Sequence, residues 1–221
     1  SGVAACAKQI NPRIQIIGVQ AEGAPAIANS FRTGERTPSD TVHTIADGIA
    51  VKTPGEKTFE YIKQYVDRVV TVSDDEIASA VLLLLERCKQ VVETSGAAPL
   101  AAVLNNKVDV KGKKVVCVLS GGNIDVSFIH KIVEKGLITR CRQLKFSVLM
   151  PDAPGALEHF SHIVAQQNAN IILFQHDRVQ TDLEIGEAII HVVCEVGGVD
   201  HAKRLINTLT ADGYKVFTSQ I

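Results

Sequence analysis

The stretch Lys113–Asp125 reads KKVVCVLSGGNID, and the interpretation of the whole chain depends on it. Its apolar, β-branched residues 115–119 predict a buried parallel strand, and the Ser-Gly-Gly-Asn that follows predicts a turn into a helix starting at Val126. Ligands of open α/β sheets bind at the carboxyl ends of strands, where this turn would lie. Ser120 would present a hydroxyl there, and Gly121 would let the backbone approach a ligand closely. Taken alone, the pattern is equally typical of a plain strand-to-helix turn.

The composition is that of a globular protein with a substantial core, since 46% of the residues are hydrophobic and 21% are charged. The formal net charge of -1 gives no electrostatic argument for a nucleic-acid or membrane partner. No apolar run in the sequence is long enough to span a bilayer. The five cysteines are scattered and several lie in apolar segments, which favours free thiols in a reducing cytoplasm over a disulfide framework.

Strands and helices alternate along the first 140 residues, which predicts an α/β domain with a parallel sheet and helices on both faces. Strands are predicted at 14–20 and 68–72. Helices are predicted at 1–8, 24–31, 55–66 and 74–88, and again up to Leu104 after a small-residue loop at 93–99. Ser73 and Glu76 have the spacing of a capping box at the start of the helix 74–88.

The pattern changes near Arg140, where the order of elements becomes β-α-β-β-α-β. The strands are predicted at 144–150, 170–176, 186–196 and 214–218, with a polar loop at 177–183. One helix follows the turn at 152–157 and extends to Asn168, and the other covers 199–211. This order predicts a ferredoxin-like domain. We therefore expect two domains, 1–140 and 141–221.

Seven short motifs carry a resemblance to a known family, and they occur in the family's order along nearly the whole chain. They are SGVA (1–4), IGVQAE (17–22), TIADG (44–48), VSDDEI (72–77), ETSGA (93–97), LSGGNID (119–125) and DAPGAL (152–157). On these motifs the chain resembles the fold type II pyridoxal-phosphate-dependent serine/threonine dehydratases, in particular the threonine ammonia-lyases, or threonine dehydratases. The second domain is similar to an ACT regulatory domain.

The resemblance implies a cofactor, a reaction and three cofactor-binding residues. The reaction is the pyridoxal-5'-phosphate-dependent β-elimination of L-threonine, with L-serine as a related substrate, to 2-oxobutanoate and ammonia. Ser120 matches the family serine at the pyridine nitrogen, Gly121 would let the backbone pass the ring, and Glu93 matches a position close to the ring. Read without the family, Glu93 is nearly as well explained as a solvated loop carboxylate.

The resemblance also implies that the reacting lysine lies outside this sequence. In the family, the lysine that forms a Schiff base with the cofactor and the glycine-rich phosphate loop precede the position of Ser1. We therefore assign no catalytic residue in this chain, and we expect the 221 residues to be inactive alone and to represent a truncated portion of the catalytic domain followed by the regulatory domain.

Amino-acid regulation is the second implication of the resemblance. In ACT domains the turn that Asp152, Pro154, Gly155 and Leu157 match lies at an interface between paired domains, where an effector binds. The expected effector is isoleucine as inhibitor or valine as activator, as in isoleucine biosynthesis, and the expected assembly is a homodimer or tetramer. The turn is also consistent with a domain that only dimerises.

A metal site is not expected, although Glu22 is a weak candidate. Some relatives bind a divalent cation through a carboxylate pair after the Gln-x-Glu strand, and Glu22 matches one member of it. The second position holds Ala28, and a hard cation needs several oxygen ligands. Two other functions stay open at this stage: a serine dehydratase or serine racemase, and a non-catalytic amino-acid-sensing module.

Overall fold

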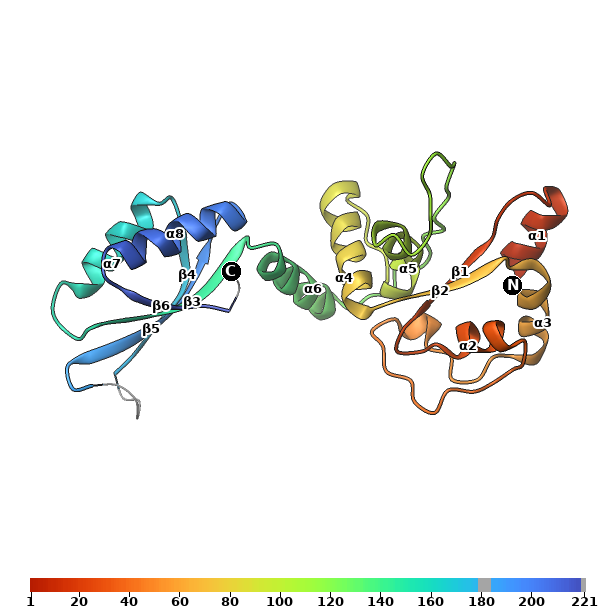
Figure 1. Cartoon of the computed structure of the whole chain (residues 1–221), viewed down its shortest axis with the longest axis horizontal. Helices are drawn as coiled ribbons and strands as arrows, with labels where there is room; N and C mark the ends of the chain where they lie inside the picture. The colour runs from red at the N-terminus through yellow and green to blue at the C-terminus, as the bar shows by residue number, and fades with distance from the viewer. Residues whose placement is uncertain (179–183, 220–221) are drawn as a thin grey trace. The chain divides into compact units, whose positions relative to one another are not determined.

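The structure is a computed structural model that describes residues 1–178 and 184–219 (Figure 1). Its internal contacts divide the chain into two compact units, Ser1–Ile132 and Val133–Ile221. The division falls inside helix α6 (Val126–Thr139), which begins at the residue that the sequence predicts. The boundary thus lies slightly earlier than the position expected near residue 140.

A pair of parallel strands forms the centre of the first unit. Strand β1 (Ile17–Ala21) runs beside β2 (Arg68–Val72), with Ile17 opposite Arg68 and Ala21 opposite Val72. The last residue of each strand is fully buried. The sequence predicted β2 with its observed bounds, whereas β1 begins three residues later than predicted. In the described part of the chain, these two strands are the whole sheet of this unit.

Helices pack around the strand pair (Figure 1). They are α1 (Gly2–Ile10), α2 (Ala26–Thr33), α3 (Glu56–Tyr65), α4 (Asp74–Leu83) and α5 (Thr94–Leu104), together with a 3₁₀ turn at Asp47–Ile49 and a π-helical turn at Leu84–Cys88. Helix α4 begins with the predicted capping box, in which the Glu76 amide donates to the Ser73 hydroxyl and the Ser73 amide donates to the Glu76 carboxylate. That box satisfies backbone donors that the first turn of a helix leaves unpaired.

The small-residue loop predicted at 93–99 is wrong, because α5 already begins at Thr94. Glycine and an internal proline both disfavour a helix when the sequence is considered alone, and Pro99 lies inside this one. Packing overrides that preference, since Ala97, Ala98, Ala101 and Ala102 are buried and let the helix approach its neighbours closely.

The strand predicted at 115–119 is also wrong, since the structure gives these residues no regular secondary structure. Val115, Val116 and Val118 are 47%, 88% and 54% exposed. A strand needs a neighbour to accept and donate its backbone hydrogen bonds. Among the residues that the structure describes, β1 and β2 pair only with each other, so this β-branched segment has no ladder to join.

The second unit has the predicted β-α-β-β-α-β order. Its elements are β3 (Gln143–Pro151), α7 (Ala156–Gln166), β4 (Asn170–Asp177), β5 (Glu187–Glu195), α8 (Val199–Ala211) and β6 (Lys215–Phe217). In the described residues the strands form an antiparallel sheet in the order β4-β5-β3-β6, which is the ferredoxin-like arrangement. Most of the loop predicted at 177–183 lies outside the described residues.

The core of this unit lies between the two helices and one face of the sheet. Alternate residues of β3 point inward, and the pattern of β5 is the same. Phe160 of α7 and Leu205 of α8 are fully buried against them. Cys194 is fully buried in β5, and burial raises the pKa of its thiol to about 12. All five cysteines of the chain are free. Within the ranges 1–178 and 184–219, no helix combines the length and apolar character needed to cross a membrane.

Candidate functional site

The loop that carries the TIADG motif is tied to the first turns of both α4 and α5. The Thr44 hydroxyl donates to Asp74 Oδ1 at 2.6 Å, and the Ile45 amide donates to Asp74 Oδ2 at 3.1 Å. From α5, the buried Thr94 hydroxyl donates to the carbonyl oxygen of Ile45 at 2.8 Å. Three of the sequence motifs therefore meet at the amino-terminal ends of two packed helices.

The Ser-Gly-Gly-Asn segment lies against the same end of α5. The Glu93 amide donates to the carbonyl oxygen of Gly121 at 3.2 Å, and the Asn123 amide donates to Glu93 Oε2 at 3.3 Å. A Cβ atom on Gly96 would come within 1.7 Å of the Ser120 carbonyl oxygen. The structure thus brings Ser120, Gly121 and Glu93 into one place, although the Ser120 residue is exposed rather than held in a strand. Their role in cofactor binding stays a prediction.

Glycines leave room for the Glu93 carboxylate on two sides. Gly121 has a φ of +75°, and a Cβ there would lie 2.1 Å from Glu93 Oε2. A Cβ on Gly48, in the TIADG loop, would lie 3.3 Å from Glu93 Oε1 and 2.8 Å from the Ser95 hydroxyl oxygen. The carboxylate therefore occupies space between two loops, and that space exists because both positions are glycine.

Ser95 lies beside these residues, and the sequence analysis did not single it out. Its Oγ atom is buried, and in the described part of the chain it has no hydrogen-bond partner. Leaving a buried hydroxyl unpaired costs about 1–3 kcal/mol, so such an atom next to a glycine-lined space fits a site that a polar ligand completes. Its place two residues after Glu93, on the first turn of α5, is the only signal in the sequence that points to it.

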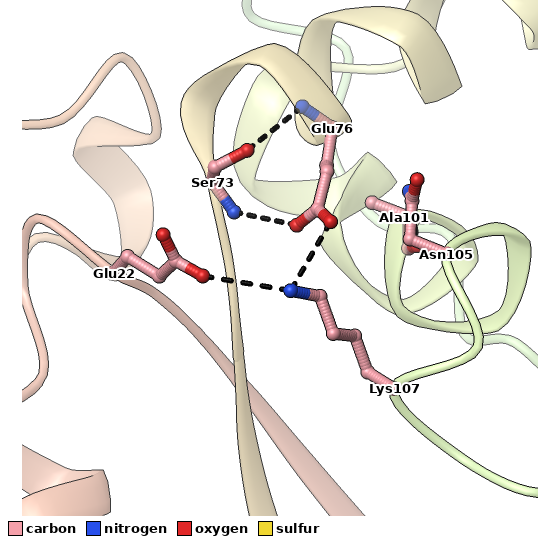
Figure 2. Close-up of polar contacts among 6 residues, drawn as sticks. All are labelled: Glu22, Ser73, Glu76, Ala101, Asn105 and Lys107. Carbon is pink, nitrogen blue, oxygen red and sulfur yellow. Dashed lines mark hydrogen bonds and ion pairs between the residues drawn. The ribbon is translucent and has the colours of Figure 1, made fainter.

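Glu22, the weak metal candidate, faces a lysine. Figure 2 shows Lys107 Nζ between two carboxylates, 3.1 Å from Glu76 Oε1 and 3.6 Å from Glu22 Oε1. The pKa of Lys107 is raised, first by its hydrogen bond to Glu76 and then by the charges of Glu76 and Glu22. Among the described residues, no group of three or more His, Cys, Asp or Glu side chains is arranged to hold a metal ion. The sequence analysis did not identify Lys107, since it lies far from both carboxylates in the chain.

The four predicted effector residues lie on one exposed turn of the second unit. Gly155 precedes α7 with a φ of +88°, and Leu157 is 45% exposed. The Asp152 amide donates to the Gly186 carbonyl oxygen at 2.8 Å, and Arg178 Nε lies 3.3 Å from Asp152 Oδ1. Pro154 is exposed on the same turn. The turn is thus a well-formed structure, and its effector role stays a prediction.

The first unit, with its parallel strands and surrounding helices, is an α/β domain in which polar loops gather at helix amino termini. The sequence profile of the family described as "Pyridoxal-phosphate dependent enzyme" matches residues 1–121. The chain belongs to this family of pyridoxal-phosphate-dependent enzymes.

Curated relatives match nearly the whole chain. The L-threonine ammonia-lyases of Thermotoga maritima and Geobacter sulfurreducens are 45% and 43% identical to it over 216 residues, which are 98% of this chain and 54% of each relative. The chain therefore spans about half the length of these relatives.

Solved structures agree with the family assignment. A threonine deaminase from "T.th." has a TM-score of 0.53 and 36% identity, covering 56% of this chain and 42% of that one. Maize serine racemase has a TM-score of 0.54 and 34% identity, covering 62% of this chain and 43% of that one. These neighbours are fold type II enzymes, so this part of the chain is an α/β domain of that type.

The site residues fit pyridoxal phosphate. A flat ring requires close backbone approach and polar groups at its edge, and the loops at 44–48 and 119–123 bring glycines and hydroxyls next to the Glu93 carboxylate. The orphaned Ser95 hydroxyl gives such a ligand one further possible hydrogen bond.

Proposed function

We propose that the complete protein is a pyridoxal-phosphate-dependent threonine ammonia-lyase that converts L-threonine to 2-oxobutanoate and ammonia. The observation that carries this proposal is the 45% identity to an L-threonine ammonia-lyase over 98% of the chain, which includes the second unit as well as the first. The test is to incubate the complete protein and the cofactor with L-threonine and measure the 2-oxo acid and ammonia. Failure to form either product would contradict the proposal.

The residues of the first unit would bind and orient the cofactor. When bound, pyridoxal phosphate supplies an electron-withdrawing ring that makes the α-proton of an amino acid removable. Ser120 would place its hydroxyl at the ring nitrogen, where it can donate or accept a hydrogen bond. Unlike a carboxylate, a hydroxyl does not hold a proton on that nitrogen, and this suits an elimination in which the leaving group departs promptly. Gly121 would let the backbone approach the ring.

Replacing Ser120 tests that role. Ser120→Ala in the complete protein should weaken cofactor binding by about three- to tenfold, because one hydrogen bond with a net value near 1 kcal/mol is removed. Ser161→Ala is a matched control, since the Ser161 hydroxyl donates to the Glu158 carbonyl oxygen on α7 of the other unit. An unchanged cofactor affinity in Ser120→Ala would exclude the contact.

We also propose that the 221 residues do not catalyse the reaction by themselves. None of their lysines lies in the lysine motif of the family, and Lys113 and Lys114, which precede the Ser120 loop, are exposed. Treating the chain with pyridoxal phosphate and borohydride should therefore leave no cofactor covalently attached to a specific lysine. A single labelled lysine found by mass spectrometry would overturn this proposal.

For the second unit we propose an ACT regulatory domain that binds a branched-chain amino acid at the turn formed by Asp152, Pro154, Gly155 and Leu157. The ferredoxin-like order of its strands supports this, as does the glycine that opens α7. Calorimetry with isoleucine, valine, serine and threonine tests it, together with the oligomeric state, for which we expect a dimer or tetramer. Binding of none of these would leave a domain that only dimerises.

A serine dehydratase or serine racemase is the second candidate, because the similarity to maize serine racemase covers 62% of this chain at a TM-score of 0.54. The assay separates them: L-serine would then be consumed faster than L-threonine, or D-serine would form from L-serine. A non-catalytic amino-acid sensor would bind amino acids but give no product with either substrate.

A further inference from the structure

Among the described residues, no strand pairs with the loop that carries Ser120. Residues 115–119 have no strand beside them among those described, and Val116 is 88% exposed. A chain segment without a ladder keeps its conformation only through contacts with the surface below it. In the described residues of this chain, the position of the Ser120 loop therefore depends on contacts with other elements.

Glu93 is the residue that contacts this loop from both its backbone and its side chain. Its amide donates to the Gly121 carbonyl oxygen at 3.2 Å, and its Oε2 atom accepts from the Asn123 amide at 3.3 Å. The two bonds reach the first and third residues after Ser120. Together they fix the backbone of the turn relative to the amino terminus of α5.

The side chain of Glu93 is used in an unusual way for a residue that precedes a helix. Glu93 is the N-cap of α5, yet it makes no side-chain hydrogen bond to the first turn of that helix. Ser73, the N-cap of α4, does make such a bond, to the Glu76 amide. The Glu93 carboxylate thus leaves its own helix turn without a side-chain cap and binds the loop instead.

The packing around the carboxylate leaves it little freedom to move. It fills the space in which a Cβ atom of Gly121 would lie, at 2.1 Å from Oε2, and it borders the corresponding space at Gly48, at 3.3 Å from Oε1. Gly96, three residues further along the chain, meets the Ser120 carbonyl oxygen so closely that no side chain fits between them. The Glu93 carboxylate therefore packs closely against Gly121 and Gly48, and the Ser120 loop packs closely against Gly96.

We infer that Glu93 is a positioning residue, whose carboxylate latches the Ser120 loop onto the amino terminus of α5 and so fixes where the Ser120 hydroxyl points. The hydrogen bonds between Glu93 and the loop are present in this chain without any cofactor. That they orient Ser120 toward pyridoxal phosphate rests on the proposed function. The family resemblance assigned Glu93 to the surroundings of the ring, whereas the structure assigns it a hold on the loop of the residue proposed to face the ring.

Hydrogen exchange of the 221-residue chain tests the latch without any cofactor. In Glu93→Ala the Asn123 amide should exchange at least about tenfold faster, since its acceptor is gone, whereas Glu93→Gln should restore most of the protection because it keeps an oxygen at the same distance along the side chain. Glu35→Ala, at an exposed glutamate after α2, is the matched control and should leave Asn123 unchanged. Equal exchange in Glu93→Ala and in the unsubstituted chain would overturn the inference.

A double-mutant cycle distinguishes a latch from a general loss of stability. Gly121→Ala should speed the exchange of the loop amides strongly in the unsubstituted chain and less so in Glu93→Ala, because the overlap with the carboxylate is then absent. Additive effects would contradict a direct fit between the two residues.

The complete protein with pyridoxal phosphate gives the third readout. Glu93→Ala should change the absorbance of the bound cofactor as Ser120→Ala does, with little further change in the double variant, and Glu93→Gln should restore the spectrum. A spectrum that changes in Ser120→Ala but stays unchanged in Glu93→Ala would overturn the positioning role. If the complete protein binds no cofactor, the proposed function fails, while the exchange experiments still decide whether the latch exists.

Discussion

The two units each contain a glycine with a left-handed backbone shortly before a helix, but the surroundings of the two glycines differ. Gly121 has a φ of +75° and Gly155 a φ of +88°, so both favour glycine for the same local reason. A Cβ on Gly121 would overlap the Glu93 carboxylate, whereas a Cβ on Gly155 would meet no atom of the described residues within 4 Å.

A glycine can be required by its backbone conformation or by close packing around it, and the sequence alone does not show which of the two applies. At Gly155 only the backbone conformation demands the residue, which is what a simple turn before a helix requires. At Gly121 the conformation and the packing demand it together, and packing of this kind is expected where a loop is held in place for a ligand. The comparison therefore favours the Ser120 loop over the Asp152 turn as the more tightly specified of the two.

The largest effect is expected from Gly121→Ala. The left-handed backbone should cost about 1–2 kcal/mol, and the overlap of the new Cβ with the Glu93 carboxylate should add about 1–3 kcal/mol. We expect the loop to detach, so that residues 113–125 become sensitive to limited proteolysis while the β1–β2 pair stays folded. Resistance to cleavage equal to that of the unsubstituted chain would show that the loop is not held in the way described.

Gly155→Ala should have the smaller effect of the pair. Its cost is limited to the backbone term of about 1–2 kcal/mol, since the new methyl group meets no neighbour among the described residues. Urea unfolding of the chain, followed by a probe in the second unit, would measure it. A loss as large as that of Gly121→Ala would mean that the turn is packed against something in the assembled protein, as an effector site between paired domains would be.

A third substitution tests the side-chain cap of α4 against α3, whose N-cap residue, Gly55, makes no side-chain hydrogen bond. Ser73→Ala removes the hydroxyl that accepts from the Glu76 amide at 3.2 Å, and it should cost about 1 kcal/mol of stability. Thr58→Ala is a suitable control, because the Thr58 hydroxyl bonds to the Gly55 carbonyl oxygen and caps no amide. Equal losses of unfolding free energy in both variants would remove the special role of the capping box.

Local patterns predicted those elements whose cause is local. Strand β2 and helix α8 have the predicted bounds, and the capping box of Ser73 and Glu76 is present as expected. Each depends on periodicity or on spacing within a few residues, which a sequence contains in full. The β-α-β-β-α-β order could be predicted for the same reason.

The wrong predictions concern segments whose structure depends on distant neighbours. The β-branched residues 115–119 have the composition of a strand but no strand beside them among the described residues, and α5 is helical through Gly96 and Pro99 because its alanines are buried. The candidate site divides in the same way. The family resemblance predicted roles for Ser120, Gly121 and Glu93, whereas the unpaired Ser95 hydroxyl and the Lys107 ion pairs are contacts that only the folded chain creates.

The smallest effect is expected at the Lys107 cluster, which joins the segment after α5 to the start of α4 and to Glu22 after β1. Because Lys107 and Glu22 are partly exposed, the ion pairs are weak and screened by salt. Lys107→Met should lower the melting temperature slightly in dilute buffer and less in about 1 M salt, where the Debye length is about 3 Å. Lys63→Met, which removes an exposed pair with Glu60 within α3, is the control.

The pH dependence of the stability of Lys107→Met tests whether Lys107 stabilises the fold through its charge. The pKa of Lys107 is raised above its ordinary value of 10.5, first by the hydrogen bond to Glu76. A group whose pKa is raised by folding stabilises fully below its ordinary pKa, and this contribution is lost as the pH rises through the raised value. The difference in melting temperature between the unsubstituted chain and Lys107→Met should thus be constant near neutral pH and vanish in strong alkali. A difference that persists there, or in concentrated salt, would mean that the lysine acts through the packing of its aliphatic stem rather than through its charge.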